Sequence, residues 1–366
     1  MKMLTIGGAM IDTIAIIESN RIERVTMRNA DSSFLMLEEG RKTEALDIST
    51  HCGGGAVNAA VSIARLGADV AILAKLGRDD RADTILTRLQ NEGVSTRHVL
   101  RDPRAPTGAS VLLSSHDRNA AVFTFRGANT LLEPVDLKRD AFAVDAVLVT
   151  TLSNNSADCF PFIIEQAKAA GALVAANPGV RQLSARGSAF LDTLARIDVL
   201  CLNSAEAGTL VPMLTARFGE HGPLLATAHG ETLPRLALRG LSAGGFDMSL
   251  AAFFAAMRRL GPGHVVVTDG GHGVFLGHAG GISYCPIHET TVAGTAGAGD
   301  AFTSTFTTFI AEGRPVDDAL RAGAINAASV CGHIDTQTGL LTRAEIETRL
   351  TALAPKLPIR HWVEGV

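Results

Sequence analysis

Residues 292–302 read Val-Ala-Gly-Thr-Ala-Gly-Ala-Gly-Asp-Ala-Phe, a run of small residues that ends in a single carboxylate. Helical periodicity follows and continues to about residue 312. Because Gly297, Ala298 and Gly299 carry almost no side chain, their backbone N–H groups can converge on a phosphate at the positive end of that helix. Asp300 stands beside them, where a general base would be useful. The alternative is a plain turn in which Asp300 caps the helix.

The composition is typical of a globular protein with a large core. The chain has 366 residues, of which 46% are hydrophobic and 19% charged. Its net charge is −4 without a block of like charges, which argues against binding to nucleic acid or to an anionic membrane. No apolar run reaches the length of a membrane span. The five scattered cysteines indicate neither a disulfide framework nor a zinc site, and they favour the cytoplasm.

Short β-rich runs alternate with helical patterns through most of the chain. This alternation predicts an α/β protein with a parallel sheet and helices on both faces, in which ligands bind at the carboxyl ends of the strands. We expect strands at 4–6, 70–74, 146–149, 173–176, 199–202 and 264–268, and helices at 56–66, 81–91, 157–170 and 204–214.

Three stretches depart from the alternation. Residues 13–50 and 97–126 contain short runs of alternating polarity that suit an antiparallel sheet, which would form a lid on the α/β core. Residues 215–245 are rich in glycine and proline without a steady period, so we expect a surface insertion there.

Two polar positions near the N-terminus are candidates for substrate binding. Gly53-Gly54-Gly55-Ala56-Val57-Asn58 opens a predicted helix. This run suits either contact of Gly54, Gly55 and Asn58 with a polar ligand or a purely structural start of the helix. Asp12 follows the first strand, where it would accept hydrogen bonds from sugar hydroxyls or simply lie in a solvated turn.

Two further motifs follow predicted strands. Asn203 and Glu206 share the first turn of a helix, where the carboxylate would hold hydrated magnesium or the pair would form a capping box. Thr268, Gly270 and Gly273 lie in a glycine-rich segment that suits either a nucleotide phosphate or a tight hairpin. The P-loop and the protein-kinase motifs are absent from the sequence.

Taken together, these motifs resemble the ribokinase-like, or phosphofructokinase-B type, carbohydrate kinases over nearly the whole chain outside 215–245. Residues 53–60, 66–68 and 76–80 are similar to the N-terminal signature of that family, and 297–302 to its C-terminal signature. Asn177-Pro178 falls where the family has an Asn-Pro turn. The resemblance implies one domain over 1–366, a three-layer α/β/α sandwich with a mostly parallel central sheet and a small antiparallel β-lid.

The resemblance also implies a reaction, the transfer of the ATP γ-phosphate to a hydroxyl of a small sugar or sugar acid. In it, Asp300 is the general base, and the Gly297–Gly299 loop stabilises the charge on the phosphoryl group. Magnesium would be held at Glu206. The sugar would contact Asp12, Gly54, Gly55 and Asn58, and the nucleotide would contact Asn203, Thr268, Gly270, Gly273 and Ala324.

Several positions depart from the family pattern. Gly294 stands where an aspartate commonly helps to form a monovalent-cation site, which argues against potassium activation. Gly55 replaces the lysine of ribokinase proper and Ala82 replaces a common glycine, so ribose, fructose and 2-keto-3-deoxygluconate stay unranked as substrates. Ala324 replaces the usual Asn or His near the adenine, which leaves only apolar contacts with the base.

Two other functions stay open. A nucleoside kinase on the same fold is favoured by the lid aromatics Phe34, Phe123 and Phe125, whose rings would stack on a base. A catalytically silent sugar-binding or structural protein is the second alternative, prompted by Gly294 and by the insertion. Unpaired backbone groups on the edge strands of the lid suggest a homodimer formed through it.

Overall fold

A computed structural model describes residues 1–18, 23–26, 33–36, 40, 42–115, 121–219, 225 and 231–363. Its centre is a ten-stranded sheet in the order β18-β17-β16-β15-β12-β11-β10-β1-β6-β7. Every neighbouring pair from β7 to β15 is parallel, whereas β16, β17 and β18 are antiparallel, so the expected mostly parallel sheet is confirmed. The strands are β1 Lys2–Ile6, β6 Asp69–Leu76, β7 Ser95–Arg101, β10 Ala146–Val149, β11 Leu173–Ala176, β12 Val199–Asn203, β15 His264–Thr268, β16 Val274–His278, β17 Gly281–Cys285 and β18 Arg360–Trp362.

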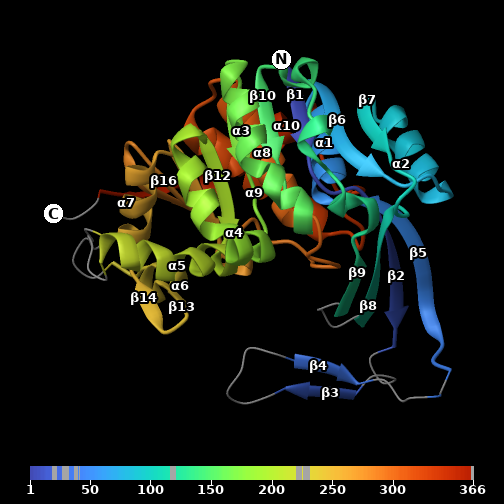
Figure 1. The fold of residues 1–366 in the computed structure, drawn as a ribbon. Coiled ribbons are helices and arrows are strands. Elements are labelled where there is room, and N and C mark those ends of the chain that lie inside the picture. Colours follow the sequence, from blue (N-terminus) through green and yellow to red (C-terminus); the bar gives the residue numbers. More distant parts are fainter. Residues whose placement is uncertain are drawn as a thin grey trace.

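Helices cover both faces of this sheet. In Figure 1, α3, α4 and α5 lie in front of the sheet, and the orange to red α8, α9 and α10 lie behind it. Alternate residues of β1 point to opposite faces of the sheet. Leu4 and Ile6 pack in the buried cluster that includes α3, α4, α5 and α7. Met3 packs in the cluster that includes α1, α2, α8, α9 and α10. The helices are α1 Gly55–Arg65, α2 Asp80–Asn91, α3 Phe160–Ala169, α4 Val180–Thr193, α5 Ser204–Phe218, α6 Arg235–Arg239, α7 Leu250–Leu260, α8 Ala298–Ala311, α9 Val316–Cys331 and α10 Arg343–Leu353.

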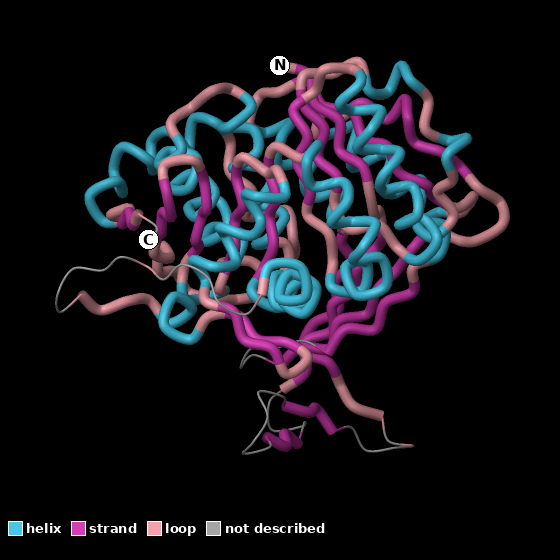
Figure 2. The backbone as a smooth tube through the Cα atoms, turned by 60° about the vertical axis from the view of Figure 1, so that its left-hand side comes forward, coloured by secondary structure: helices cyan, strands magenta, loops and turns pink. Residues whose placement is uncertain are grey.

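A second, smaller sheet projects from the carboxyl edge of the first and forms the lid (Figure 2). Its strands are ordered β5-β2-β8-β9, with bounds β2 Met10–Ile17, β5 Ala45–Gly53, β8 Gly108–Ser115 and β9 Ala121–Phe125. β2–β5 and β8–β9 are antiparallel as expected, but β2–β8 is parallel. The reason is that β2 follows β1 and β8 follows β7, and these two parallel strands end at the same edge of the central sheet. A separate hairpin joins β3 Glu23–Thr26 and β4 Ser33–Met36.

The expected lid and insertion have different limits in the structure. Residues 95–101 form β7, which pairs with β6 in the central sheet, so the second lid segment starts at Gly108 and not at 97. At the expected insertion, α5 continues to Phe218. Beyond it, α6 and the hairpin of β13 Leu241–Ala243 and β14 Phe246–Met248 are described. The parts of these two expectations at 19–22, 27–32, 37–39, 41, 116–120, 220–224 and 226–230 lie outside the described residues.

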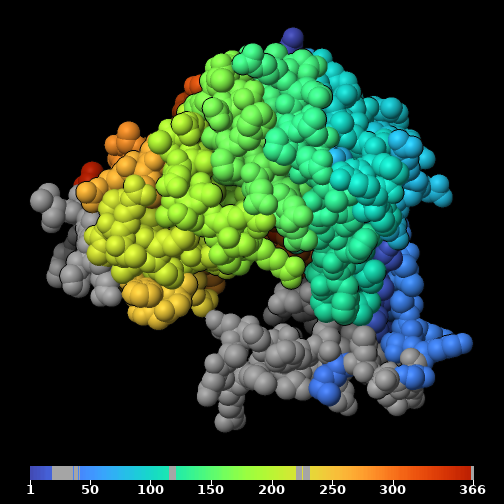
Figure 3. Space-filling view, viewed as in Figure 1, coloured from blue at the N-terminus to red at the C-terminus, as the bar shows by residue number. Residues whose placement is uncertain are grey.

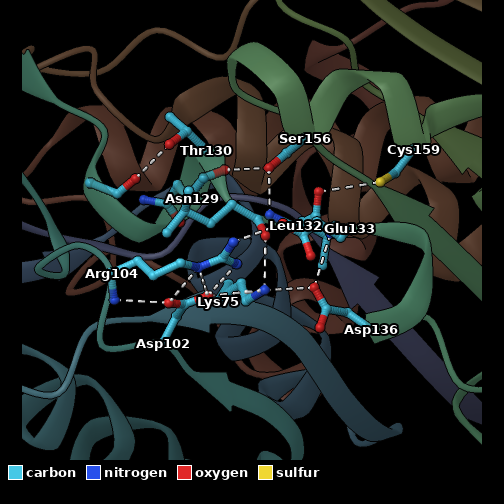
Figure 4. A network of polar contacts seen from close by, with 12 residues as sticks. Lys75, Asp102, Arg104, Asn129, Thr130, Leu132, Glu133, Asp136, Ser156 and Cys159 are labelled. Atoms are coloured by element: carbon cyan, nitrogen blue, oxygen red, sulfur yellow. Dashed lines mark hydrogen bonds and ion pairs between the residues drawn. The ribbon is translucent and has the colours of Figure 1, made fainter.

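A buried ionic cluster holds the base of the lid (Figure 4). Lys75 in β6 donates to Asp136 Oδ2 at 2.7 Å and to the Leu131 carbonyl at 2.8 Å, and its Nζ lies 3.2 Å from Asp102 Oδ2. Arg104 adds hydrogen bonds to Asp102, which hold the pKa of that carboxyl well below its usual range. Since residues 102–107 lead into β8 and residues 126–136 follow β9, this cluster anchors both ends of that hairpin.

Candidate active site

The predicted functional residues gather where the order of the central strands reverses. β1 lies between β6 and β10, and ligands of open α/β sheets bind at the carboxyl edge of such a switch point. Gly7 and Thr150 follow β1 and β10, and a Cβ on Gly7 would overlap the Thr150 hydroxyl. A Cβ on Gly55 would lie 3.0 Å from Thr150 Oγ1 and 3.4 Å from Asp300 Oδ1. Thr150, Gly55 and Asp300 therefore surround one small volume.

The loop before α8 provides free backbone donors. Gly297 is the N-cap of α8 at φ +80°, and a Cβ there would lie 2.7 Å from Thr336 Cβ, so the position requires glycine. No side chain caps the helix, and Asp300 in its first turn is bonded to Asn58 instead. Nothing lies within 4 Å of a Cβ placed on Gly299. Ala298 N donates to the Thr295 carbonyl at 3.4 Å, and the next N–H groups of the first turn of α8 are available to an anion.

A chain of hydrogen bonds fixes the carboxylate of Asp300. Asn58 Nδ2 in α1 donates to Asp300 Oδ2 at 2.8 Å. Asn58 is only 3% exposed, and its Oδ1 accepts from Thr336 Oγ1 at 2.8 Å and from Gln337 Nε2 at 3.1 Å. Arg88 Nε in α2 then donates to Gln337 Oε1 at 3.0 Å. In the structure Asn58, which we expected to bind the sugar, thus holds the carboxylate of Asp300.

Burial and mutual repulsion raise the pKa values of the acidic groups at the site. Burial raises the pKa of Asp300, the Asn58 hydrogen bond opposes this shift, and the charge of Asp12 adds to it. Burial likewise raises the pKa of Asp12, against the effects of Ser110 and His51. The pKa of Glu206 rises to about 7, chiefly through burial and in part through the charge of Asp300. The negative charge of Asp12 thus acts on Asp300, and that of Asp300 acts on Glu206. A bound proton or metal ion would reduce this repulsion.

Asp12 lies in the lid, on the side of the sheet that meets the glycine run. It pairs with Ser110 in β8 and with His51 in β5, and the Ser110 hydroxyl donates to its Oδ1. A Cβ on Gly53 would overlap the Asp12 carboxylate, so glycine at 53 makes room for this side chain. Gly54 has φ +96° and packs against the backbone of Gly8. The expected substrate residues Asp12, Gly54 and Gly55 are thus brought close together.

The lid aromatics face the other way. Phe123 pairs with Val111, and Phe125 with Ala109, in rows adjacent to the row that contains Asp12. Because successive residues of a strand point to opposite faces, these rings lie on the face away from Asp12, where they are 63% and 51% exposed. The structure therefore removes the stacking argument for a nucleoside substrate at these two positions. The side chain of Phe34 lies outside the described residues.

Asn203 and Glu206 form the capping box that was one of the two predicted alternatives. The Asn203 side chain accepts from Glu206 N, and Glu206 Oε2 accepts from Asn203 N, each at 2.8 Å. Over the described part of the chain, no basic side chain forms an ion pair with Glu206, and no group of acidic, His or Cys residues could hold a metal by itself. The single carboxylate of Glu206, which has no ion-pair partner among the described residues and has a raised pKa, is suited to a magnesium ion that takes most of its ligands from phosphates.

The predicted nucleotide residues flank this helix start. Thr268 ends β15 in register with Asn203 of β12, so both lie at the same sheet edge. Gly270 and Gly273 have φ +53° and +97° in the turn between β15 and β16, and the turn by itself explains both glycines. Ala324 lies in α9 and is only 9% exposed, packed among the core residues around α8.

Comparison with known proteins identifies the family. The model of the pfkB family carbohydrate kinases matches residues 12–231 and 247–343. The chain belongs to this family. The internal segment left unmatched, 232–246, is shorter than the expected insertion at 215–245. The fold and the match agree, so this protein is a carbohydrate kinase.

Individual relatives of this carbohydrate kinase carry several names. A deoxyribokinase of Salmonella typhi is 26% identical and aligns with 87% of this chain and 92% of its own. A 2-dehydro-3-deoxygalactonokinase of Haloferax volcanii is 26% identical, over 79% of this chain and 85% of its own. Arabidopsis thaliana ribokinase, solved with ribose and ATP, shares the fold with a TM-score of 0.68 at 21% identity, covering 95% of this chain and 98% of its own.

Sequence reasoning missed several residues of this candidate site. Ser110, Thr150, Thr336 and Gln337 contact the predicted residues from distant parts of the chain, and 279 positions separate Gln337 from Asn58. None of them belongs to a motif with a chemical meaning of its own. Only the glycine requirement at 55 and 297 pointed to close neighbours, without saying which neighbours these are.

Proposed function

We propose that this carbohydrate kinase transfers the γ-phosphate of ATP to a hydroxyl of a small sugar or sugar acid, with Asp300 as the general base. The observation that carries the proposal is the position of Asp300 in the first turn of α8. There its carboxylate lies beside free N–H groups of an uncapped helix and beside the space left by Gly55. A base and an anion site side by side are what phosphoryl transfer to a hydroxyl requires.

In the proposed reaction, Asp300 accepts the proton of the acceptor hydroxyl through Oδ1, because Oδ2 is engaged by Asn58. The hydroxyl oxygen forms a bond to the γ-phosphorus while the bond to the bridging oxygen breaks and ADP leaves. The N–H groups of the Gly297–Gly299 loop stabilise the negative charge on the phosphoryl oxygens. Magnesium bound to the ATP phosphates and, through water, to Glu206 would neutralise further charge.

The acceptor would be held from the lid side. Asp12 accepts hydrogen bonds from substrate hydroxyls, and Gly54 and Gly55 leave room for them against the backbone. Asn203, Thr268, Gly270, Gly273 and Ala324 would border the nucleotide. In keeping with five free cysteines, we place the enzyme in the cytoplasm. In the described chain, no helix combines the length and apolarity that a membrane crossing requires.

We also propose that the lid forms a homodimer. Its face away from Asp12 carries a group of exposed apolar side chains, namely Leu46, Ile48, Val111, Phe123 and Phe125. These come from β5, β8 and β9, and in Figure 3 the β8–β9 hairpin projects below the body of the molecule, with a recess beside it. A second copy of the same face would cover these side chains from water.

The test is ADP release with a panel of sugars, sugar acids and nucleosides. We expect Asp300→Asn to lower kcat by about 10²- to 10⁴-fold, because it removes the base, and to leave ATP affinity nearly unchanged, because the N–H groups remain. Asp192→Asn, an exposed position at the end of α4, is the matched control. Absence of ADP release with every acceptor would favour the silent sugar-binding protein, whereas an unchanged rate in Asp300→Asn would exclude Asp300 as the general base.

A further inference from the structure

The loop that follows β10 joins the catalytic centre to a region outside the sites described above. Its first residue, Thr150, lies beside Asp300 and Gly55. Three residues later, Ser153 Oγ accepts from Arg126 Nη1 at 3.2 Å. Arg126 follows the last strand of the lid and is partly buried. The guanidinium group of Arg126 is thus held at one end of the short loop 150–153, and the other end of this loop lies beside Asp300.

A second arginine flanks the same loop from the other side. A Cβ on Gly179 would lie 2.9 Å from Thr151 Cγ2, and Leu152 N donates to Gln182 Oε1 at 3.1 Å. Arg181 lies between these contacts as the second residue of α4. No side chain caps α4, so its first N–H groups, in the same turn as Arg181, are not engaged by a capping side chain.

The two positive charges lack compensation. Neither Arg126 nor Arg181 forms an ion pair within the described residues, whereas many other arginines of this protein do. Burial, and then the charge of Arg181, lower the pKa of Arg126, so the two guanidinium groups lie near enough for Arg126 to sense the charge of Arg181. Arg181 is exposed, whereas Arg126 is partly buried, and an anion bound between them would compensate the less solvated charge. Guanidinium groups bind carboxylate and phosphate oxygens in a bidentate manner.

We propose that Arg126 and Arg181 bind an oxyanion of the acceptor substrate, so that the enzyme phosphorylates an anionic sugar derivative in preference to a neutral sugar. The inference rests on the proposed kinase function. The segment from Thr150 to Ser153 extends over at most about 10 Å, so one sugar-sized molecule reaches both the base and the arginines. A carboxylate and a phosphate share this chemistry, and the experiment separates them.

The experiment measures kcat and KM by ADP release with three classes of acceptor. These are ribose and fructose as neutral sugars, gluconate and 2-keto-3-deoxygluconate as carboxylates, and ribose 5-phosphate and fructose 6-phosphate as phosphates. The variants are Arg126→Gln and Arg181→Gln. Arg196→Gln is the matched control, because it removes one exposed positive charge just before β12, at the amino-terminal edge of the sheet.

We expect the wild type to prefer one anionic class. Each of the two arginine variants should lower kcat/KM for that class by about 10- to 100-fold, mainly through KM, because each removes a charge-assisted hydrogen bond. Values for neutral sugars, the KM for ATP and the control variant should stay unchanged. Equal losses of kcat/KM for neutral and anionic acceptors would overturn the assignment. A raised KM for ATP would also overturn it, because it would place the arginines at the nucleotide.

Thermal shifts with the same compounds separate this inference from the kinase proposal. If no acceptor releases ADP but an anionic sugar stabilises the wild type and not Arg126→Gln, the anion site holds and the kinase function fails. If neither turnover nor anion-dependent stabilisation occurs, both fail. If only neutral sugars are turned over, the kinase function holds and the anion site fails.

Discussion

Replacing Asn58 by leucine tests whether this residue holds the catalytic base. The substitution roughly keeps the volume of the side chain but removes the 2.8 Å hydrogen bond from Nδ2 to Asp300 Oδ2, together with the acceptor of Thr336 and Gln337. A hydrogen bond to a charged group contributes about 1.5–3 kcal/mol, and 1.36 kcal/mol corresponds to one pKa unit, so the pKa of Asp300 should rise by about one to two units. Burial already raises this pKa, and only the Asn58 hydrogen bond opposes the shift.

The assay is the pH profile of kcat/KM, followed by ADP release between about pH 5 and pH 9. A base with a raised pKa stays protonated to higher pH, so the acidic limb of the profile should move up by one to two units while the alkaline plateau changes much less. Ser62→Ala is the matched control, because Ser62 lies one turn further along α1 and contacts Ser304, not the carboxylate. A uniform loss at every pH, with an unmoved limb, would refute the reasoning and assign Asn58 to substrate contact.

Three further predictions concern the metal site, the base of the lid and the dimer. The pKa of Glu206 is raised from 4.5 to about 7, so between these pH values the folded protein binds a proton that the unfolded chain has lost, and the free energy of unfolding falls as the pH rises. Glu206→Gln should therefore flatten the dependence of Tm on pH, and it should weaken activation by magnesium. Lys75→Met leaves Asp102 and Asp136 buried without their cation, and denaturant unfolding should show a loss of about 3–5 kcal/mol. Phe123→Lys on the outer lid face should convert dimers to monomers in sedimentation velocity, without an effect on the fold.

Local patterning determined most of the elements of the central sheet. Each strand expected at 4–6, 70–74, 146–149, 173–176, 199–202 and 264–268 lies within an observed strand, because buried parallel strands are short continuous apolar runs. The same rule missed β7 at Ser95–Arg101, which contains several basic residues and lies at the edge of the sheet. Its alternating polarity resembled that of the lid strands, and only the pairing with β6 assigns it to the core.

The parallel pairing of β2 and β8 is a second case in which sequence was insufficient. Alternating polarity predicts a half-exposed strand but not the direction of its neighbour. The direction follows from where β1 and β7 end, which is a property of the central sheet. The same pairing decides that Asp12 faces the site while Phe123 and Phe125 face away from it.

The sequence by itself determined the chemistry that we propose for this protein, because the proposed phosphate-binding loop and the proposed base lie within a few adjacent residues, Gly297 to Asp300. The flexibility of glycine and the position of the loop at the start of a helix are local properties, and they act in the same way wherever the chain places them. Only the tertiary structure decided what holds Asp300 and what surrounds the acceptor. Asn58, Gln337, Arg126 and Arg181 reach the site through contacts between distant segments, and such contacts leave no periodic signal in the chain.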